Sequence, residues 1–121
     1  MMRRRPIRGR DTADPEGVDR IESYRPALDS WLAHLSFERR LAARSVSAYG
    51  TDLEGHFGWL ADRGCPLTEV GTGEIEAWLT SLYKAGYRAS SRARRVAALR
   101  SFYGFAVRGG LVRRDPAESL P

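Results

Sequence analysis

The residues best suited to chemistry in this sequence are the cations of its C-terminal half. From Ala77 to Arg114 the chain has no Asp or Glu, and its nine cations there are Lys84, Arg88, Arg92, Arg94, Arg95, Arg100, Arg108, Arg113 and Arg114. Charges of one sign repel one another, so such a dense group of cations indicates that the chain binds an anion. Guanidinium groups suit paired hydrogen bonds to phosphate and guanine. The run therefore predicts nucleic-acid binding, although an Arg-rich genome would also explain the choice of Arg over Lys.

Other kinds of chemistry have little support in the sequence. Cys65 is the only cysteine, and neither His34 nor His56 has a second ligand at metal spacing. No phosphate-binding glycine loop, Ser/His/Asp set or carboxylate pair is evident. We expect no metal, cofactor or small-molecule ligand. The lone cysteine favours a reducing, cytoplasmic compartment. No apolar run approaches the ~18–20 residues of a membrane span, so we expect no membrane association.

Four stretches with helical periodicity must position these cations. They are expected near residues 24–40, 44–63, 73–85 and 90–108. Their apolar stripes are, in order, Leu28, Trp31, Leu32 and Leu35; Val46, Tyr49, Leu53, Phe57 and Leu60; Ile75, Trp78, Leu79, Leu82 and Tyr83; and Val96, Leu99, Phe102, Tyr103 and Ala106. Thr72 is predicted to cap the third helix, and Gly64, Gly86 and Gly109-Gly110 to end helices.

These elements predict an all-α, compact bundle of four to five helices, with a short fifth element after Asp115-Pro116. Residues 1–22 are poor in apolar side chains and are predicted to form a flexible basic arm. Residues 23–117 are expected to fold, and residues 118–121 to begin a linker. Trp31, Trp59, Trp78, Phe57, Phe102 and Tyr103 are expected in the core. Phe105 is expected to project outward, toward a neighbouring domain or protomer.

The second and fourth helices have unusual outer faces. The sides opposite their stripes carry Arg44, Ser47, Ala48, Thr51 and Gly55, and Ser90, Arg94, Ala97, Ser101 and Arg108. Small side chains let a helix approach a DNA groove while Arg and hydroxyl groups reach phosphates and bases. An ordinary exposed face in an Ala- and Arg-rich sequence is the alternative. Arg92 and Arg95 lie nearer the stripe, where they could reach phosphates or pair with Asp52 or Glu54.

Two runs of this sequence resemble the core-binding domain of Xer-type tyrosine recombinases, in the phage integrase family. The first run, Leu41 to Leu60, has Ala48-Tyr49, Asp52-Leu53, Phe57 and Trp59-Leu60 in the family's order. The second, Gly86 to Phe105, is similar to the last major helix of that domain. The ending Gly110-Leu-Val-Arg-Arg-Asp115-Pro116 resembles the exit toward the linker. The resemblance covers about Tyr24 to Pro121.

The resemblance implies a SAM-like domain that grips one side of a DNA half-site, with double-stranded DNA and other recombinase protomers as partners, near the nucleoid. Carried over by position, the expected DNA contacts are Arg44, Ser45, Ser47 and Thr51 from the second helix, and Ser90, Ser91, Arg92, Arg94, Arg95 and Arg100 from the fourth. Tyr49 and Asp52 match positions that we interpret as structural.

Two departures from the family pattern matter. Gly50 and Thr51 stand where basic residues usually follow the Tyr, which predicts weaker phosphate contacts there. The family's catalytic Arg, Lys, His-x-x-Arg pair and nucleophilic Tyr have no counterparts, because no Arg follows either histidine by three residues and Tyr103 lies on a core stripe. We therefore expect a non-enzymatic piece of a longer recombinase. The alternatives are a stand-alone helical DNA-binding regulator and a helical protein–protein adaptor.

Overall fold

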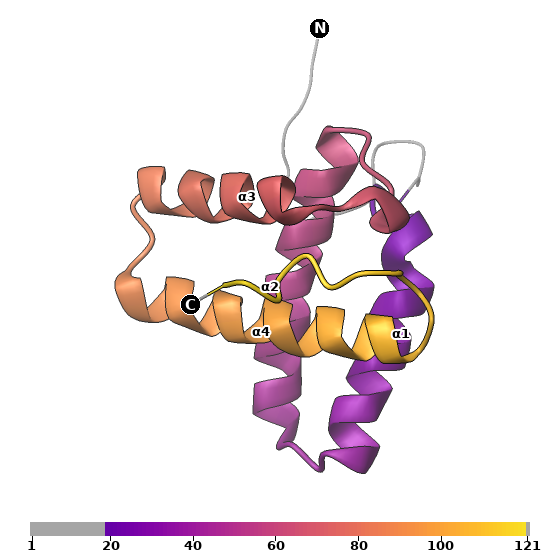
Figure 1. Cartoon of the computed structure of the whole chain (residues 1–121). Coiled ribbons are helices and arrows are strands. Elements are labelled where there is room, and N and C mark those ends of the chain that lie inside the picture. The colour runs from indigo at the N-terminus through magenta and orange to yellow at the C-terminus, as the bar shows by residue number, and fades with distance from the viewer. Residues whose placement is uncertain (1–18, 121) are drawn as a thin grey trace, which may run out of the picture.

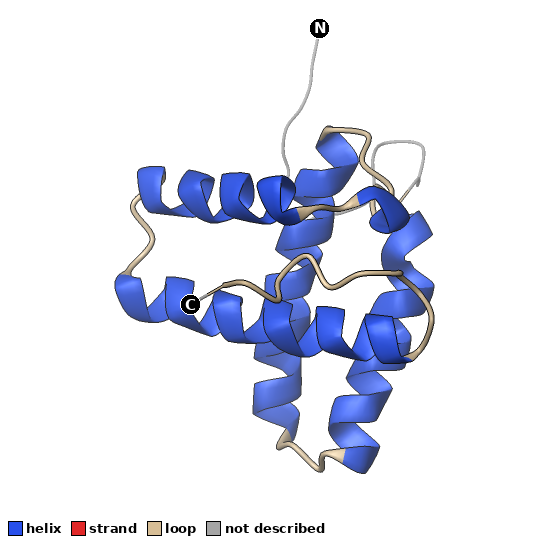
Figure 2. Cartoon of the chain, in the orientation of Figure 1, coloured by secondary structure: helices blue, strands red, loops and turns tan. Residues whose placement is uncertain are grey.

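The computed structural model describes residues 19–120, and every regular element in that range is a helix (Figure 2). The four long helices are α1 (Arg25–Ala33), α2 (Ala43–Asp62), α3 (Thr72–Lys84) and α4 (Ala89–Arg108). Three short ones are η1 (Glu22–Tyr24), the π-helical η2 (His34–Glu38) and η3 (Leu67–Glu69). The predicted all-α fold and its four helices are confirmed.

The helices form two crossed hairpins. Figure 1 shows α1 with η2 running antiparallel to α2, and α3 running antiparallel to α4 across them. α4 packs against α1, α2 and α3, and α2 also contacts α3, so the two hairpins are joined mainly through α4. The C-terminal segment turns back along α4, where Asp115 Oδ1 accepts a hydrogen bond from the N–H of Ala117 at 2.8 Å. The expected fifth element is therefore a capped turn rather than a helix.

Aromatic side chains fill the space where the hairpins cross. Phe102 of α4 packs edge-on against Trp31 of α1 and Phe57 of α2, with ring centroids 5.6 Å and 5.3 Å away. Five of the six aromatics expected in the core are buried. Trp59, the sixth, is half-buried, and the guanidinium of Arg63 lies 3.6 Å from its ring centroid.

Three side chains lie on sides of their helices that the periodicity did not predict. Tyr83, assigned to the buried stripe of α3, is 67 % exposed. Phe105, assigned to the outside, is half-buried with its ring 5.1 Å from that of His34. Ser101, assigned to the outer face of α4, accepts a hydrogen bond from Trp31 Nε1 at 3.0 Å. A single apolar stripe does not predict the buried side of a helix whose neighbouring helices change along its length.

The ends of the helices follow the expected residues with two exceptions. Gly64 has a φ of 64° after α2, and the N–H of Cys65 bonds to the carbonyl of Leu60 at 3.0 Å, as in a Schellman cap. The cap of α3 is Gly71 rather than Thr72, because Glu74 Oε1 reaches back to the N–H of Gly71 at 2.8 Å. The first helix widens into η2 and ends at Glu38, two residues before Arg40, whose φ is 56°.

The packed unit extends beyond the boundaries that composition suggested. Ile21, which was assigned to the arm, is buried in the core, and Tyr24 stacks on Phe57 with ring centroids 4.9 Å apart. Leu120, which was assigned to the linker, is also buried. The rest of the predicted arm, residues 1–18, lies outside the described residues. The folded unit therefore includes at least Ile21 to Leu120.

Candidate nucleic-acid interface

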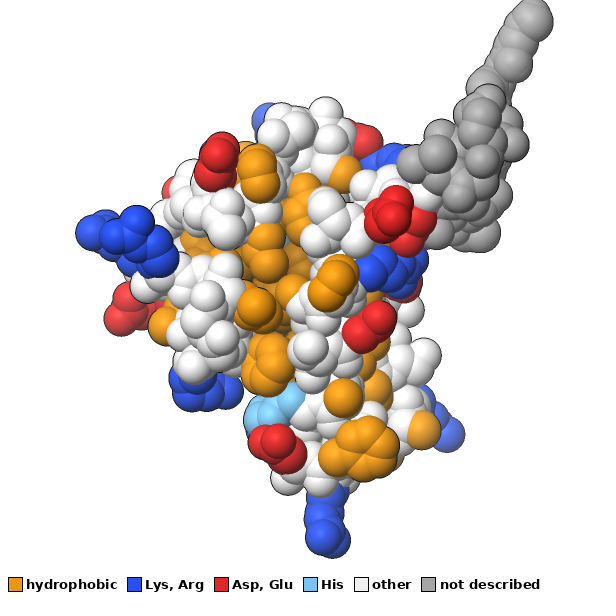
Figure 3. Space-filling view, turned by 90° about the vertical axis from the view of Figure 1, so that its right-hand side faces the viewer, with side chains coloured by type: hydrophobic (Ala, Val, Ile, Leu, Met, Phe, Trp, Pro, Cys, Tyr) orange, Lys and Arg blue, Asp and Glu red, His pale blue; other side chains and the backbone are white. Residues whose placement is uncertain are grey.

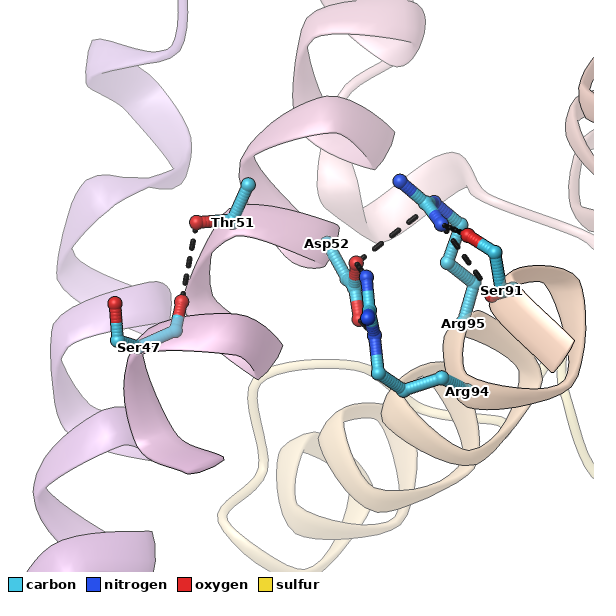
Figure 4. A network of polar contacts seen from close by, with 6 residues as sticks. All are labelled: Ser47, Thr51, Asp52, Ser91, Arg94 and Arg95. Atoms are coloured by element: carbon cyan, nitrogen blue, oxygen red, sulfur yellow. Dashed lines mark hydrogen bonds and ion pairs between the residues drawn. The ribbon is translucent and has the colours of Figure 1, made fainter. Parts of the chain in front are cut away.

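The first part of the candidate surface is the N-terminal half of α2. Arg44, Ser45, Ser47 and Thr51 are all exposed there. Thr51 Oγ1 donates a hydrogen bond to the carbonyl of Ser47 at 3.1 Å, so these two side chains lie one turn apart on the same side of the helix (Figure 4). The surface thus combines one cation with three hydroxyl groups.

Two helices of this surface begin without side-chain caps. Ala42 precedes α2 and Arg88 precedes α4; both have extended backbones and neither makes a side-chain capping hydrogen bond. The first N–H groups of a helix have no partner within it and carry a partial positive charge, so they suit an anion. In α3, by contrast, the carboxylate of Glu74 lies over the N-terminus. The free N–H groups at the N-termini of α2 and α4 can therefore bind phosphate, in addition to the side chains of these helices.

An ion pair between the buried Asp52 and the exposed Arg94 fixes the α2 surface relative to α4. Asp52 is buried, and its two oxygens accept hydrogen bonds from Arg94 Nε at 2.9 Å and Nη2 at 2.8 Å. These hydrogen bonds and the nearby carboxylate raise the pKa of Arg94 above its usual value. The Arg94 side chain remains 45 % exposed. Figure 4 shows Asp52 pointing from α2 toward α4, with Ser47 and Thr51 on the other side of α2.

Arg95 and Arg92 have different surroundings, although both were expected near the stripe. Arg95 Nε lies 3.7 Å from Asp52 Oδ1, and Arg95 also donates to Ser91 Oγ. Arg92 donates to the carbonyl of Tyr87 in the α3–α4 turn. Of the open alternatives, pairing with Asp52 is therefore observed for Arg95, and Glu54 instead lies 3.1 Å from Arg25.

The expected residues fall into two groups. Nine of them occupy the N-terminal halves of α2 and α4, which Asp52 and Arg94 join. Arg100 lies apart, because it donates a hydrogen bond to the carbonyl of Leu120 in the C-terminal segment. A DNA contact by Arg100 stays a prediction, and it would need that guanidinium to leave Leu120.

The sequence patterns did not predict the Asp52–Arg94 pair, because the two residues meet only where α2 and α4 cross. The available signal was the position of Asp52, directly before the core residue Leu53 on the flank of the stripe. A carboxylate at such a position requires a cationic or hydrogen-bonding partner from another element.

The α1 side of the molecule looks different. Figure 3 shows that face with a hydrophobic strip along its middle and with Lys and Arg side chains only near its edges. The nine cations between Ala77 and Arg114, where the sequence has no Asp or Glu, lie instead mainly on α4 and on the segments on either side of it. The candidate interface therefore centres on the α2 and α4 surfaces rather than on the α1 face.

Between residues 19 and 120, no group of three or more His, Cys, Asp or Glu side chains could hold a metal ion. No helix in the same range is long and apolar enough to cross a membrane.

A family model and several known proteins also match the sequence of this chain. Residues 28–110 match the family model described as phage integrase, N-terminal SAM-like domain. The chain is 32 % identical over 102 residues to the tyrosine recombinase XerD of Chlorobaculum tepidum, covering 84 % of this chain and 34 % of that protein.

Two other tyrosine recombinases match this chain over a similar range. The tyrosine recombinase XerD of Agrobacterium fabrum is 42 % identical over 89 residues, covering 74 % of this chain and 27 % of its own length. The tyrosine recombinase XerC of Roseiflexus castenholzii is 38 % identical over 94 residues, covering 77 % and 30 %. The chain thus spans about a third of the length of the curated relatives it matches.

Proposed function

Because the chain belongs to the phage integrase N-terminal SAM-like domain family, in its Xer-type tyrosine recombinase branch, we propose that it is the DNA-binding domain of a site-specific recombinase. It grips one side of a DNA half-site with the N-terminal halves of α2 and α4. Strand exchange belongs to a catalytic domain, and other recombinase protomers are partners. The observation that carries this proposal is the ion pair between the buried Asp52 and Arg94, which joins the N-terminal halves of α2 and α4 and so fixes where their exposed cations and hydroxyl groups lie.

Each part of the surface has a role in this proposal. Arg44 and the uncapped N-termini of α2 and α4 bind phosphates, which position the protein without reading sequence. Ser47 and Thr51 are short enough to let α2 approach a groove and can hydrogen-bond to base edges. Arg94 faces the same ligand with the part of its side chain that remains exposed beside Asp52. Affinity from such contacts falls as salt rises.

The burial of Tyr103 supports a binding role for this domain. A recombinase nucleophile must reach a phosphodiester, but Tyr103 is fully buried and its hydroxyl lies 2.7 Å from His56 Nε2. Burial also raises the pKa of Tyr103 well above its usual value, which disfavours the phenolate. In our proposal the domain therefore supplies binding and orientation and no covalent chemistry.

The test is fluorescence anisotropy of a pool of short labelled duplexes of mixed sequence, titrated at salt concentrations from ~50 to ~200 mM. We expect binding that weakens steeply with salt. Arg44→Ala should weaken it and flatten the plot of log affinity against log salt by about one unit, since one phosphate contact is lost.

Arg63→Ala is the matched control. It removes the same charge from the other end of α2, 19 residues or about 28 Å away, and should leave the slope unchanged. Arg94→Ala is less suitable, because it also removes the partner of the buried Asp52. If the wild-type chain does not bind at ~50 mM salt, where phosphate contacts are strong, the proposal is wrong and the adaptor alternative gains support.

A further inference from the structure

Two tyrosines beside α4 are exposed without an evident structural reason. Tyr83, at the C-terminal end of α3, is 67 % exposed, and Tyr87, in the α3–α4 turn, is 41 % exposed. Tyr83 was expected in the core, so its position is a consequence of tertiary packing. An aromatic ring left on the surface with a polar hydroxyl is typical of residues that meet a partner.

Each of these rings holds an arginine of α4. The guanidinium carbon of Arg92 lies 5.0 Å from the ring centroid of Tyr83, and that of Arg95 lies 4.7 Å from the ring centroid of Tyr87. Arginines above aromatic faces at these distances are attracted by the ring quadrupole. Both guanidinium groups are also held from a second direction, Arg92 by the carbonyl of Tyr87 and Arg95 by Ser91. The two cations are therefore fixed before any ligand arrives.

The charges around these stacks favour an anionic partner. The neighbouring Lys84 and Arg88 are exposed and cationic, and no Asp or Glu occurs from Ala77 to Arg114. In the described part of the chain Arg92 has no carboxylate partner, and the only carboxylate near Arg95 is Asp52, which already accepts two hydrogen bonds from Arg94. A ligand with both anionic groups and apolar surfaces fits this edge, and the sugar–phosphate backbone of DNA has both.

We propose that Tyr83 and Tyr87 are positioning residues that hold Arg92, and the exposed part of Arg95, toward the phosphates of a DNA strand, beside the groove that α4 approaches. This inference rests on the proposed function and adds two residues to it. The benefit is entropic, because a flexible arginine loses side-chain freedom when it binds phosphate, whereas an arginine already stacked on a ring has lost part of it beforehand.

The test compares Tyr→Leu with Tyr→Phe at both positions, by the same anisotropy titrations with salt. Leu removes the ring, whereas Phe keeps the ring and removes only the hydroxyl. We expect each Leu variant to bind the duplex pool about two- to fivefold more weakly and with a flatter salt dependence. The Phe variants should bind within about twofold of the wild type, because the ring face is retained.

Phe37→Leu is the matched control, because Phe37 is 80 % exposed on η2 and no arginine stacks on it in the described residues. It should bind as the wild type does, and circular dichroism should show that all five variants are folded. If the wild type binds DNA and the Leu variants bind equally well, the inference is wrong and the proposed function stands. If the Phe variants are as weak as the Leu variants, the hydroxyl groups act directly and positioning by the rings is wrong. If the wild type does not bind, both proposals fail.

Discussion

At the scale of single residues, His56 is the titratable group most changed by the fold. It is fully buried between aromatic rings, with Trp78 at 4.8 Å and Phe57 at 5.8 Å between centroids. Its Nε2 lies 2.7 Å from the hydroxyl of Tyr103, while Nδ1 is buried and has no hydrogen-bond partner among the described residues. Burial lowers the pKa of His56 to about 3. The neutral imidazole is therefore a core side chain of this domain.

This burial predicts that the domain loses stability in mild acid. The unfolded chain binds a proton at His56 below the ordinary pKa of about 6.5, whereas the folded chain does not until about pH 3. The stability contribution is thus complete above pH 6.5 and is lost as the pH falls toward 3. We expect the free energy of unfolding to fall by about 2 kcal/mol from this group between pH 7.5 and pH 5.

Urea denaturation at several pH values measures this loss. The double variant His56→Leu/Tyr103→Phe replaces both hydrogen-bonding partners with apolar groups, so it should fold and should lack this part of the pH dependence. Other titrating groups contribute equally to both proteins and cancel in the comparison. Equal pH dependence of the two proteins would show that the folded state binds a proton at His56 as readily as the unfolded chain does.

At the scale of elements, the joint between α2 and α4 determines the shape of the candidate interface. Asp52 is buried on α2, and its two hydrogen bonds to Arg94 link a core position to a surface that we propose binds DNA. Removing the arginine leaves a buried carboxylate without these hydrogen bonds and is costly, even where the whole pair contributes little. The pair therefore stabilises one particular arrangement of the two helices.

We expect Arg94→Ala to lower the free energy of unfolding by about 2 kcal/mol, because Asp52 loses two charged hydrogen bonds and only Arg95 remains near it. Urea denaturation followed by circular dichroism measures this. Arg44→Ala serves as the reference, since an exposed arginine should change stability by less than about 0.5 kcal/mol. Equal stability of the two variants would mean that Arg95 replaces Arg94 or that Asp52 does not need a partner.

At the scale of the whole molecule, the folded unit includes a segment that composition excluded. Ile21 is buried, and residues near it are tied to α2: Arg25 lies 2.7 Å from Asp19 and 3.1 Å from Glu54, and Arg20 bonds to Asp62. The Tyr24 hydroxyl also donates to the carbonyl of Cys65 at 2.6 Å. The segment before α1 therefore closes one end of the core.

Ile21→Ala should accordingly reduce the free energy of unfolding by about 2–4 kcal/mol, as expected for truncating a buried Ile. Glu22→Ala, one residue away and exposed, should change it by less than about 0.5 kcal/mol. Thermal or urea unfolding distinguishes the two. A small effect of Ile21→Ala would place the boundary of the folded unit after this residue, as its composition suggested.

The sequence by itself determined the fold class, the four helices and most of the core. Helical periodicity and glycine stops depend on local backbone geometry, which the order of residues specifies directly. It also identified the arginine-rich run and the surfaces of α2 and α4, because charge and side-chain type need no tertiary contact to be recognised.

Only the tertiary structure decided what each cation contacts. Arg94 pairs with Asp52, Arg100 bonds to the C-terminal segment and Tyr83 lies outside, because hairpins far apart in sequence cross at these places. A helical wheel assumes one buried side, but α4 packs against three helices in turn. The identity of a side chain is local information, and its partner is a property of the packing.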